Sequence, residues 1–279
     1  MQEISFQLSH RRINGLAFGD PTKPLIVALH GWLDNAASFI PLSEHLSDYY
    51  LVAIDFVGHG HSEHRSPDAH YHQMDFVQDL HEIVESQMWD DFILLGHSMG
   101  GIVGSLYASS FPEKVTKFIS IEAFGPITKE AEVSAQQLRD SIESRIRLRD
   151  RSAKHPTSFS QAVQARINAG YMEPSSAELL VERNLSKQDD ILKWRTDRRL
   201  RTISSVRLTH SQAEFFMRNL TMPVMVIHGT KGFDQVRGFV ESRQEWVKDL
   251  TIENCPGGHH LHMDEPQPVS QVISEFLES

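Results

Sequence analysis

The stretch GHSMGG at residues 96–101 constrains the fold of this chain more than any other part of its sequence. It follows residues 91–95, an apolar run with the length and composition of a buried strand, and it precedes residues 102–108, which have the character of a buried helix. A strand, a G-x-S-x-G turn and a helix in this order make up a nucleophile elbow, in which a sharp reversal of the chain pushes the hydroxyl of Ser98 outward. The alternative is a glycine-rich turn that holds a serine by chance, and the flanking strand and helix argue against it.

The rest of the N-terminal half contains further short apolar runs, separated by stretches with helical spacing. The predicted strands cover residues 4–8, 12–18, 25–29, 50–54, 91–95 and 115–121. The first two are expected to be antiparallel edge strands, whereas continuous apolar runs such as the third are typical of strands buried on both faces. This alternation predicts an α/β fold with a mainly parallel central sheet and helices on both of its faces.

Between residues 127 and 219 the alternation stops. This stretch is polar, rich in Gln, Arg and Ser, and it offers helical segments but no convincing strand. The α/β pattern returns at residues 223–229, and a further strand at residues 250–253 precedes the closing helix. We therefore predict a core made of residues 1–126 and 220–279, with a helical cap, residues 127–219, inserted after the sixth strand.

The composition argues against several classes of protein. A formal net charge of −10 disfavours a general binder of nucleic acid or of anionic membranes. Cys255 is the only cysteine, so no internal disulfide can form, which fits a reducing compartment. The first residues lack the apolar core of a signal peptide, and no apolar run approaches membrane-spanning length. We expect a cytoplasmic protein with no nucleic-acid or membrane partner, and the sequence leaves its oligomeric state open.

Ser98 needs partners, because a serine hydroxyl is too weakly acidic to attack a carbonyl unaided. In an elbow-based site the base is a histidine in the loop after the last strand, and here that loop reads PGGHHLH at residues 256–262. His259 directly follows the two glycines, which let the loop turn back toward Ser98, so we assign it as the base. His260 and His262 are expected to pack around it.

Two carboxylates compete to orient this base. The usual position is the loop after strand 223–229, but Lys231 and Gly232 stand there and Asp234 comes late. Glu122 ends the strand that follows the elbow helix, so it lies at the same edge of the sheet. We favour Glu122 and keep Asp234 as the alternative acid; a dyad without an acid also stays open. If it has no catalytic role, Asp234 is expected to cap the helix that follows it.

Acyl transfer also needs two hydrogen-bond donors aimed at the developing oxyanion. The N–H of Met99, directly after the nucleophile, supplies one, and the N–H of Trp32, in the loop after the third predicted strand, is placed to supply the other. The side chains of Trp32 and His97 are expected to line the substrate pocket. Histidines also cluster at residues 59–64 and 259–262, but without a fixed-spacing set of Cys, Asp or Glu ligands, so we expect no metal and no cofactor.

In order and spacing these motifs resemble the α/β-hydrolase superfamily. The resemblance spans nearly the whole chain and rests on four stretches: HGWLDN at residues 30–35, residues 55–62, residues 96–101, and residues 258–266. The HGWLDN loop, the cap segment at residues 194–200 and the late Gly232-Phe233-Asp234 are most similar to the serine hydrolase-like (Kraken-type) proteins.

The resemblance implies Ser98 as nucleophile, His259 as base, and Trp32 and Met99 as oxyanion donors. The strand end around Glu122 also resembles haloalkane dehalogenases that place their acid there. Those enzymes use an aspartate nucleophile, so the serine argues against dehalogenase or epoxide-hydrolase chemistry.

These observations predict a carboxylesterase-like serine hydrolase that cleaves small to medium ester substrates through an acyl-enzyme. The alternative is C–C bond, lactone or peracid chemistry on the same triad. A non-catalytic binding protein of the same fold is less favoured, although fold alone does not establish function. A small-molecule ester is the only partner that we predict.

Overall fold

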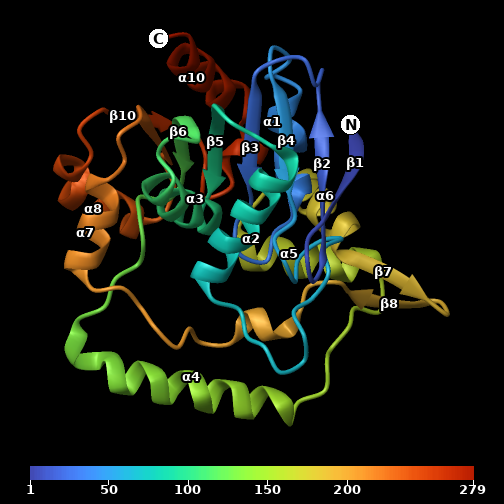
Figure 1. Cartoon of the computed structure of the whole chain (residues 1–279). Helices are drawn as coiled ribbons and strands as arrows, with labels where there is room; N and C mark the ends of the chain where they lie inside the picture. Colours follow the sequence, from blue (N-terminus) through green and yellow to red (C-terminus); the bar gives the residue numbers. More distant parts are fainter.

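The computed structural model describes residues 1–279, and an eight-stranded sheet forms its centre (Figure 1). The strand order is β1-β2-β4-β3-β5-β6-β9-β10. These strands are β1 (Gln2–Gln7), β2 (Arg12–Phe18), β3 (Leu25–Leu29), β4 (Tyr50–Ile54), β5 (Phe92–His97), β6 (Val115–Ile121), β9 (Val224–Gly229) and β10 (Leu250–Cys255). β2 is antiparallel to both β1 and β4, and every pair from β4 to β10 is parallel. The predicted α/β fold, with its antiparallel N-terminal edge, is confirmed.

Alternate side chains of the strands fill two hydrophobic clusters, because successive residues of a strand point to opposite faces. In β3, for example, Val27 and Leu29 join one cluster, while Ile26 and Ala28 join the other. Helices that complete the first cluster are α2 (Gln73–Gln87), α3 (Met99–Ser110) and α8 (Asp234–Arg243). Those that complete the second are α1 (Ile40–Ser43), α9 (Leu261–Asp264) and α10 (Pro266–Glu278). Helices therefore cover both faces of the sheet.

Between β6 and β9 the chain forms mainly helices. They are α4 (Ser134–Arg149), α5 (Phe159–Gly170), α6 (Pro174–Asn184) and α7 (His210–Arg218), with the short β7 (Leu185–Gln188) and β8 (Ile191–Trp194) and the 3-10 turn Arg198–Arg201. α4 lies apart from the sheet, and Ser141 is its one buried residue (Figure 1). α7 packs against the core through Ala213 and Met217. No helix combines the length and the apolar character that crossing a membrane requires.

The β7–β8 hairpin differs from the sequence prediction, which placed no strand in this region. Its two strands pair antiparallel around Asp189 and Asp190, whose φ angles are +49° and +63°. Aspartate tolerates this left-handed conformation better than most residues, and a two-residue turn with both φ angles positive matches the twist of a hairpin. Strands of four residues are too short and, here, too polar to show a period-2 pattern in the sequence.

Candidate active site

Ser98 lies in a strained turn between β5 and α3. Its φ of 51° and ψ of −115° are unusual for a residue with a side chain, and its backbone N–H donates to the carbonyl of Ile121 at 2.8 Å. The two flanking glycines make the crossing of strand and helix possible. A Cβ on Gly96 would lie 2.4 Å from the carbonyl oxygen of Gly100, and a Cβ on Gly100 would lie 2.0 Å from that of Leu29. The sequence GHSMGG therefore builds the predicted elbow.

A continuous chain of hydrogen bonds joins Ser98, His259 and Glu122. Nε2 of His259 lies 2.9 Å from Oγ of Ser98, and Nδ1 lies 3.0 Å from Oε2 of Glu122. The Glu122 side chain is completely buried, and that of His259 is 13% exposed. The ring of Phe233 stacks on the imidazole with a centroid distance of 4.1 Å. The structure thus brings together the serine, the histidine and the preferred carboxylate of the sequence analysis.

Glu122 reaches His259 because its backbone turns at the end of β6 with a φ of +53°. Backbone N–H groups fix its carboxylate: that of Gly229 donates to Oε1 at 2.8 Å, and that of Phe233 donates to Oε2 at 3.2 Å. Asp234, the alternative acid, is the first residue of α8. Its carboxylate is almost fully exposed and pairs with Arg237 at 2.5 Å, so the structure does not bring it to the histidine.

Gly232 lies in the loop after β9, the usual position of the acid in such sites. Because it has no side chain, the Glu122 carboxylate can occupy the space beside it. A Cβ on Gly232 would lie 2.1 Å from Oε1 of Glu122, far inside van der Waals contact. We expect Gly232→Ala to push the carboxylate away from His259 and to lower kcat about tenfold to a hundredfold, the range that small misplacements cause. Gly238→Ala is the matched control, because a Cβ there has no neighbour within 4 Å. Equal turnover of the two variants on a chromogenic ester would contradict this account of Gly232.

Trp32 and Met99 lie in the segments expected to supply oxyanion donors. Met99 is the first residue of α3, and helix geometry leaves its N–H without an acceptor inside the helix. Trp32 lies in the loop after β3, and its backbone N–H donates to no group of the protein. Trp32 is 49% exposed, and its Nε1–H donates to the carbonyl of Leu200, in the segment between β6 and β9, at 3.0 Å. The Trp32 side chain therefore joins the loop after β3 to the segment between β6 and β9.

His97 does not line a pocket, contrary to the sequence prediction. It ends β5, and its side chain is completely buried. β5 lies in the middle of a sheet that helices cover on both faces, so its last side chain packs inside the protein. Nε2 of His97 lies 2.8 Å from the carbonyl oxygen of His259, so the side chain contacts the back of the histidine loop.

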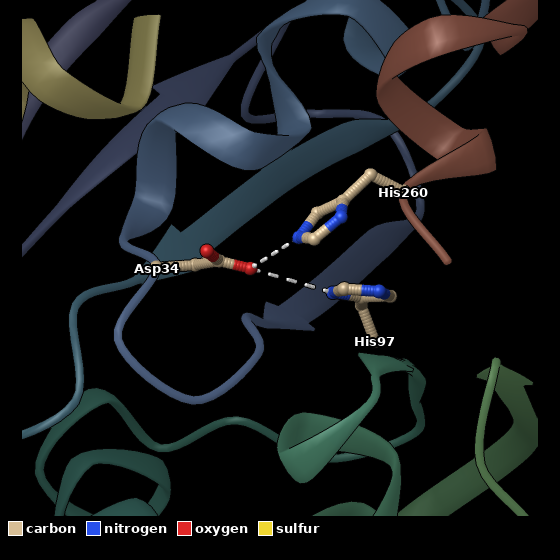
Figure 2. Close-up of side chains that lie close together, drawn as sticks. All are labelled: Asp34, His97 and His260. Carbon is tan, nitrogen blue, oxygen red and sulfur yellow. Dashed lines mark hydrogen bonds and ion pairs between the residues drawn. The ribbon is translucent and has the colours of Figure 1, made fainter. Parts of the chain in front are cut away.

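Asp34, His97 and His260 form a buried polar cluster behind this loop (Figure 2). Oδ2 of Asp34 lies 3.3 Å from Nε2 of His260 and 3.7 Å from Nδ1 of His97. Oδ1 of Asp34 forms an ion pair with Arg166 of α5. Burial opposes ionisation of Asp34, but Arg166 and His260 outweigh burial and hold the pKa of this carboxyl well below its usual range. Asp34 is therefore a buried carboxylate with a cationic partner from α5.

The three clustered side chains are of types that bind metal ions, and their ligand atoms lie within 4.8 Å of one another. Nη2 of Arg166, however, binds Asp34 and lies 3.2 Å from Nε2 of His260. The guanidinium already supplies the positive charge that a metal ion would bring to this carboxylate. The cluster fits an internal ion pair better than a metal site.

Sequence reasoning missed the contribution of Asp34, Arg166 and Phe233 to this region. Asp34 is part of the HGWLDN motif, but its partner Arg166 lies 132 residues further along the chain. Phe233 directly precedes Asp234. The sequence analysis considered only the carboxylate of Asp234, which is exposed, and not the ring of Phe233, which stacks on His259. No sequence pattern signals these contacts, because the residues that make them come together only when the chain folds.

The parallel sheet, the elbow and the buried chain of hydrogen bonds define a protein of the α/β-hydrolase class. A family model described as the alpha/beta hydrolase fold matches residues 24–266, and the chain belongs to this family. Within the family it is similar to human serine hydrolase-like protein 2, with 32% identity over 100% of this chain and 94% of the relative. The resemblance inferred from the motifs is confirmed.

Two further comparisons agree with this placement. A hypothetical protein from Pseudomonas aeruginosa PAO1, known from a crystal structure, is 35% identical, with a TM-score of 0.93 and full coverage of both chains. The 2-(acetamidomethylene)succinate hydrolase of Mesorhizobium japonicum is 25% identical over 92% of this chain and 88% of the relative. Family membership supports a hydrolase activity for this chain.

Proposed function

We propose that this protein is a carboxylesterase-like serine hydrolase, which cleaves small to medium ester substrates through an acyl-enzyme. The observation that carries the proposal is the pair of hydrogen bonds, 2.9 Å and 3.0 Å long, that joins Ser98, His259 and Glu122 at a nucleophile elbow. A hydroxyl, an imidazole and a buried carboxylate in this order match the three roles of a catalytic triad.

In the proposed reaction, Oγ of Ser98 attacks the ester carbonyl while Nε2 of His259 takes the hydroxyl proton. Glu122 accepts a hydrogen bond from Nδ1–H, which keeps Nε2 free as a base and stabilises the imidazolium that forms. The backbone N–H groups of Trp32 and Met99 donate to the oxyanion of the tetrahedral intermediate. Its collapse breaks the ester bond, and His259 protonates the departing alcohol.

Deacylation repeats these steps with water. His259 removes a proton from a water molecule, which attacks the acyl-enzyme and releases the acid and the free Ser98 hydroxyl. The cap, residues 127–219, is proposed to shape the acyl pocket, and the contact between Trp32 and Leu200 supports a place for the cap close to the oxyanion loop. The reaction needs no cofactor.

Two measurements on the wild-type protein test the proposal. A fluorophosphonate probe is expected to label one serine, which peptide mapping identifies as Ser98, and p-nitrophenyl esters from acetate to palmitate are expected to be cleaved best at short and medium chain lengths. Labelling without cleavage of any ester would favour C–C bond, lactone or peracid chemistry on the same residues. A protein that is neither labelled nor active would contradict the proposal and favour a non-catalytic binding protein.

A further inference from the structure

Buried side chains contact the loop that carries His259 at two consecutive residues, His259 and His260. The carbonyl oxygen of His259 lies 2.8 Å from Nε2 of His97. The ring of His260 contacts the carboxylate of Asp34 at 3.3 Å (Figure 2). Neither His97 nor Asp34 reaches a site where substrate could touch it, because the side chains of both are at most 2% exposed. Their contacts act on the position of His259 rather than on substrate.

The partner of His97 determines which nitrogen carries its hydrogen. A carbonyl oxygen only accepts, so Nε2 of His97 must be the donor in the 2.8 Å contact. Burial lowers the pKa of His97 well below its usual range, so the ring is neutral near pH 7 and has one N–H to give. That single N–H is directed at the main chain of His259.

Asp34 connects this support to the cap. Its Oδ2 faces the two histidines, and its Oδ1 pairs with Arg166 of α5, whose positive charge balances a carboxylate that would be costly to bury alone. The glycine of the HGWLDN motif gives the carboxylate room, since a Cβ on Gly31 would lie 2.8 Å from Oδ2 of Asp34 and 2.9 Å from Nδ1 of His97.

We propose that His97 and Asp34 are positioning residues, which hold the main chain of the His259 loop so that the imidazole stays aligned with the nucleophile. The inference rests on the proposed function, because it assigns His259 the role of base. Displacements of about 1 Å in a catalytic group can cost about a hundredfold in rate, so a fixed main chain behind the base has a direct effect on turnover.

Paired substitutions at His97 test the proposal. The side-chain amide nitrogen of glutamine reaches about as far as Nε2 of histidine, whereas that of asparagine ends near the position of Nδ1. We expect His97→Asn to lower kcat and the rate of phosphonate labelling about tenfold to a hundredfold, with KM within about threefold of wild type. His97→Gln keeps the donor to the His259 carbonyl and is expected to recover most of the lost rate.

His262→Asn is the matched control. Its ring is also completely buried and lies 4.1 Å from that of His97, but both of its nitrogens lack a hydrogen-bond partner. This variant removes the same atoms from the same region without touching the His259 main chain, and its labelling rate should stay close to wild type. Thermal unfolding midpoints of all variants show whether a lost rate reflects a lost fold.

Four outcomes would overturn the inference. His97→Asn labelled as fast as wild type, or His97→Gln as slow as His97→Asn in folded protein, would show that the Nε2 donor has no positioning role. If His97→Asn does not fold, Asp34→Asn provides the second test, and a wild-type labelling rate in that variant would show that the contact between Asp34 and His260 does not position His259. A wild-type protein that the phosphonate does not label would overturn the proposed function and this inference with it.

Discussion

Ser98→Ala is expected to lower kcat/KM for p-nitrophenyl esters by about 10⁴-fold to 10⁶-fold and to abolish phosphonate labelling. In the proposed mechanism the alanine removes the oxygen that forms the acyl-enzyme, and losing a triad nucleophile costs about this much in a serine protease. The remaining rate should come from the oxyanion donors alone. The fold should persist, since the elbow depends on glycines 96 and 100 rather than on the hydroxyl.

Ser105→Ala is the appropriate control for this prediction. Ser105 lies on α3, the helix that follows Ser98; it is buried and uses its hydroxyl only in a hydrogen bond to the carbonyl of Ile102 at 2.7 Å. Its esterase activity should stay within about threefold of wild type, because the substitution leaves a backbone carbonyl that is already bonded in the helix. If Ser98→Ala kept the wild-type rate, ester cleavage would have to occur elsewhere on the protein.

The sequence was sufficient to locate Ser98 and His259, because local patterns define the elements on either side of them. An elbow needs a strand, a glycine-bracketed turn and a helix within a few residues, and all three are contiguous here. The loop of His259 can also be recognised from neighbouring residues, because it lies between the last strand and the closing helix. Parallel strands place their carboxyl ends at one edge, so these two distant segments had to meet.

The choice between Glu122 and Asp234 could not be settled in this way, because both follow strands that end at that same edge. The decision depends on the room that Gly232 leaves and on a left-handed φ at Glu122, neither of which has a sequence pattern. The inward direction of His97 and the pairing of Asp34 with Arg166 were likewise unpredictable. They follow from packing between segments that the chain brings together only on folding.

Glu122→Gln is expected to lower kcat by about 10³-fold to 10⁴-fold, while Asp234→Asn should stay within about threefold of wild type. Glutamine preserves the shape of the side chain and can still accept from the N–H of Gly229. Its amide NH₂, however, would face Nδ1 of His259, which favours the tautomer with hydrogen on Nε2 and removes the base that Ser98 needs. A carboxylate-to-amide change of this kind costs about 10⁴-fold in a serine protease triad.

The comparison of these two variants separates three arrangements of the site. A collapse in Asp234→Asn together with near-normal turnover in Glu122→Gln would contradict the preferred acid, and it would require the exposed start of α8 to unwind toward His259. Near-normal turnover in both variants would indicate a dyad of Ser98 and His259. We expect neither result, because the Asp234 side chain is 94% exposed and paired with Arg237, whereas the Glu122 carboxylate is buried against the imidazole it orients. The hydrogen-bond partners of this buried carboxylate are His259 and the backbone N–H groups of Gly229 and Phe233. Its negative charge would therefore stabilise an imidazolium at His259 with little screening by water.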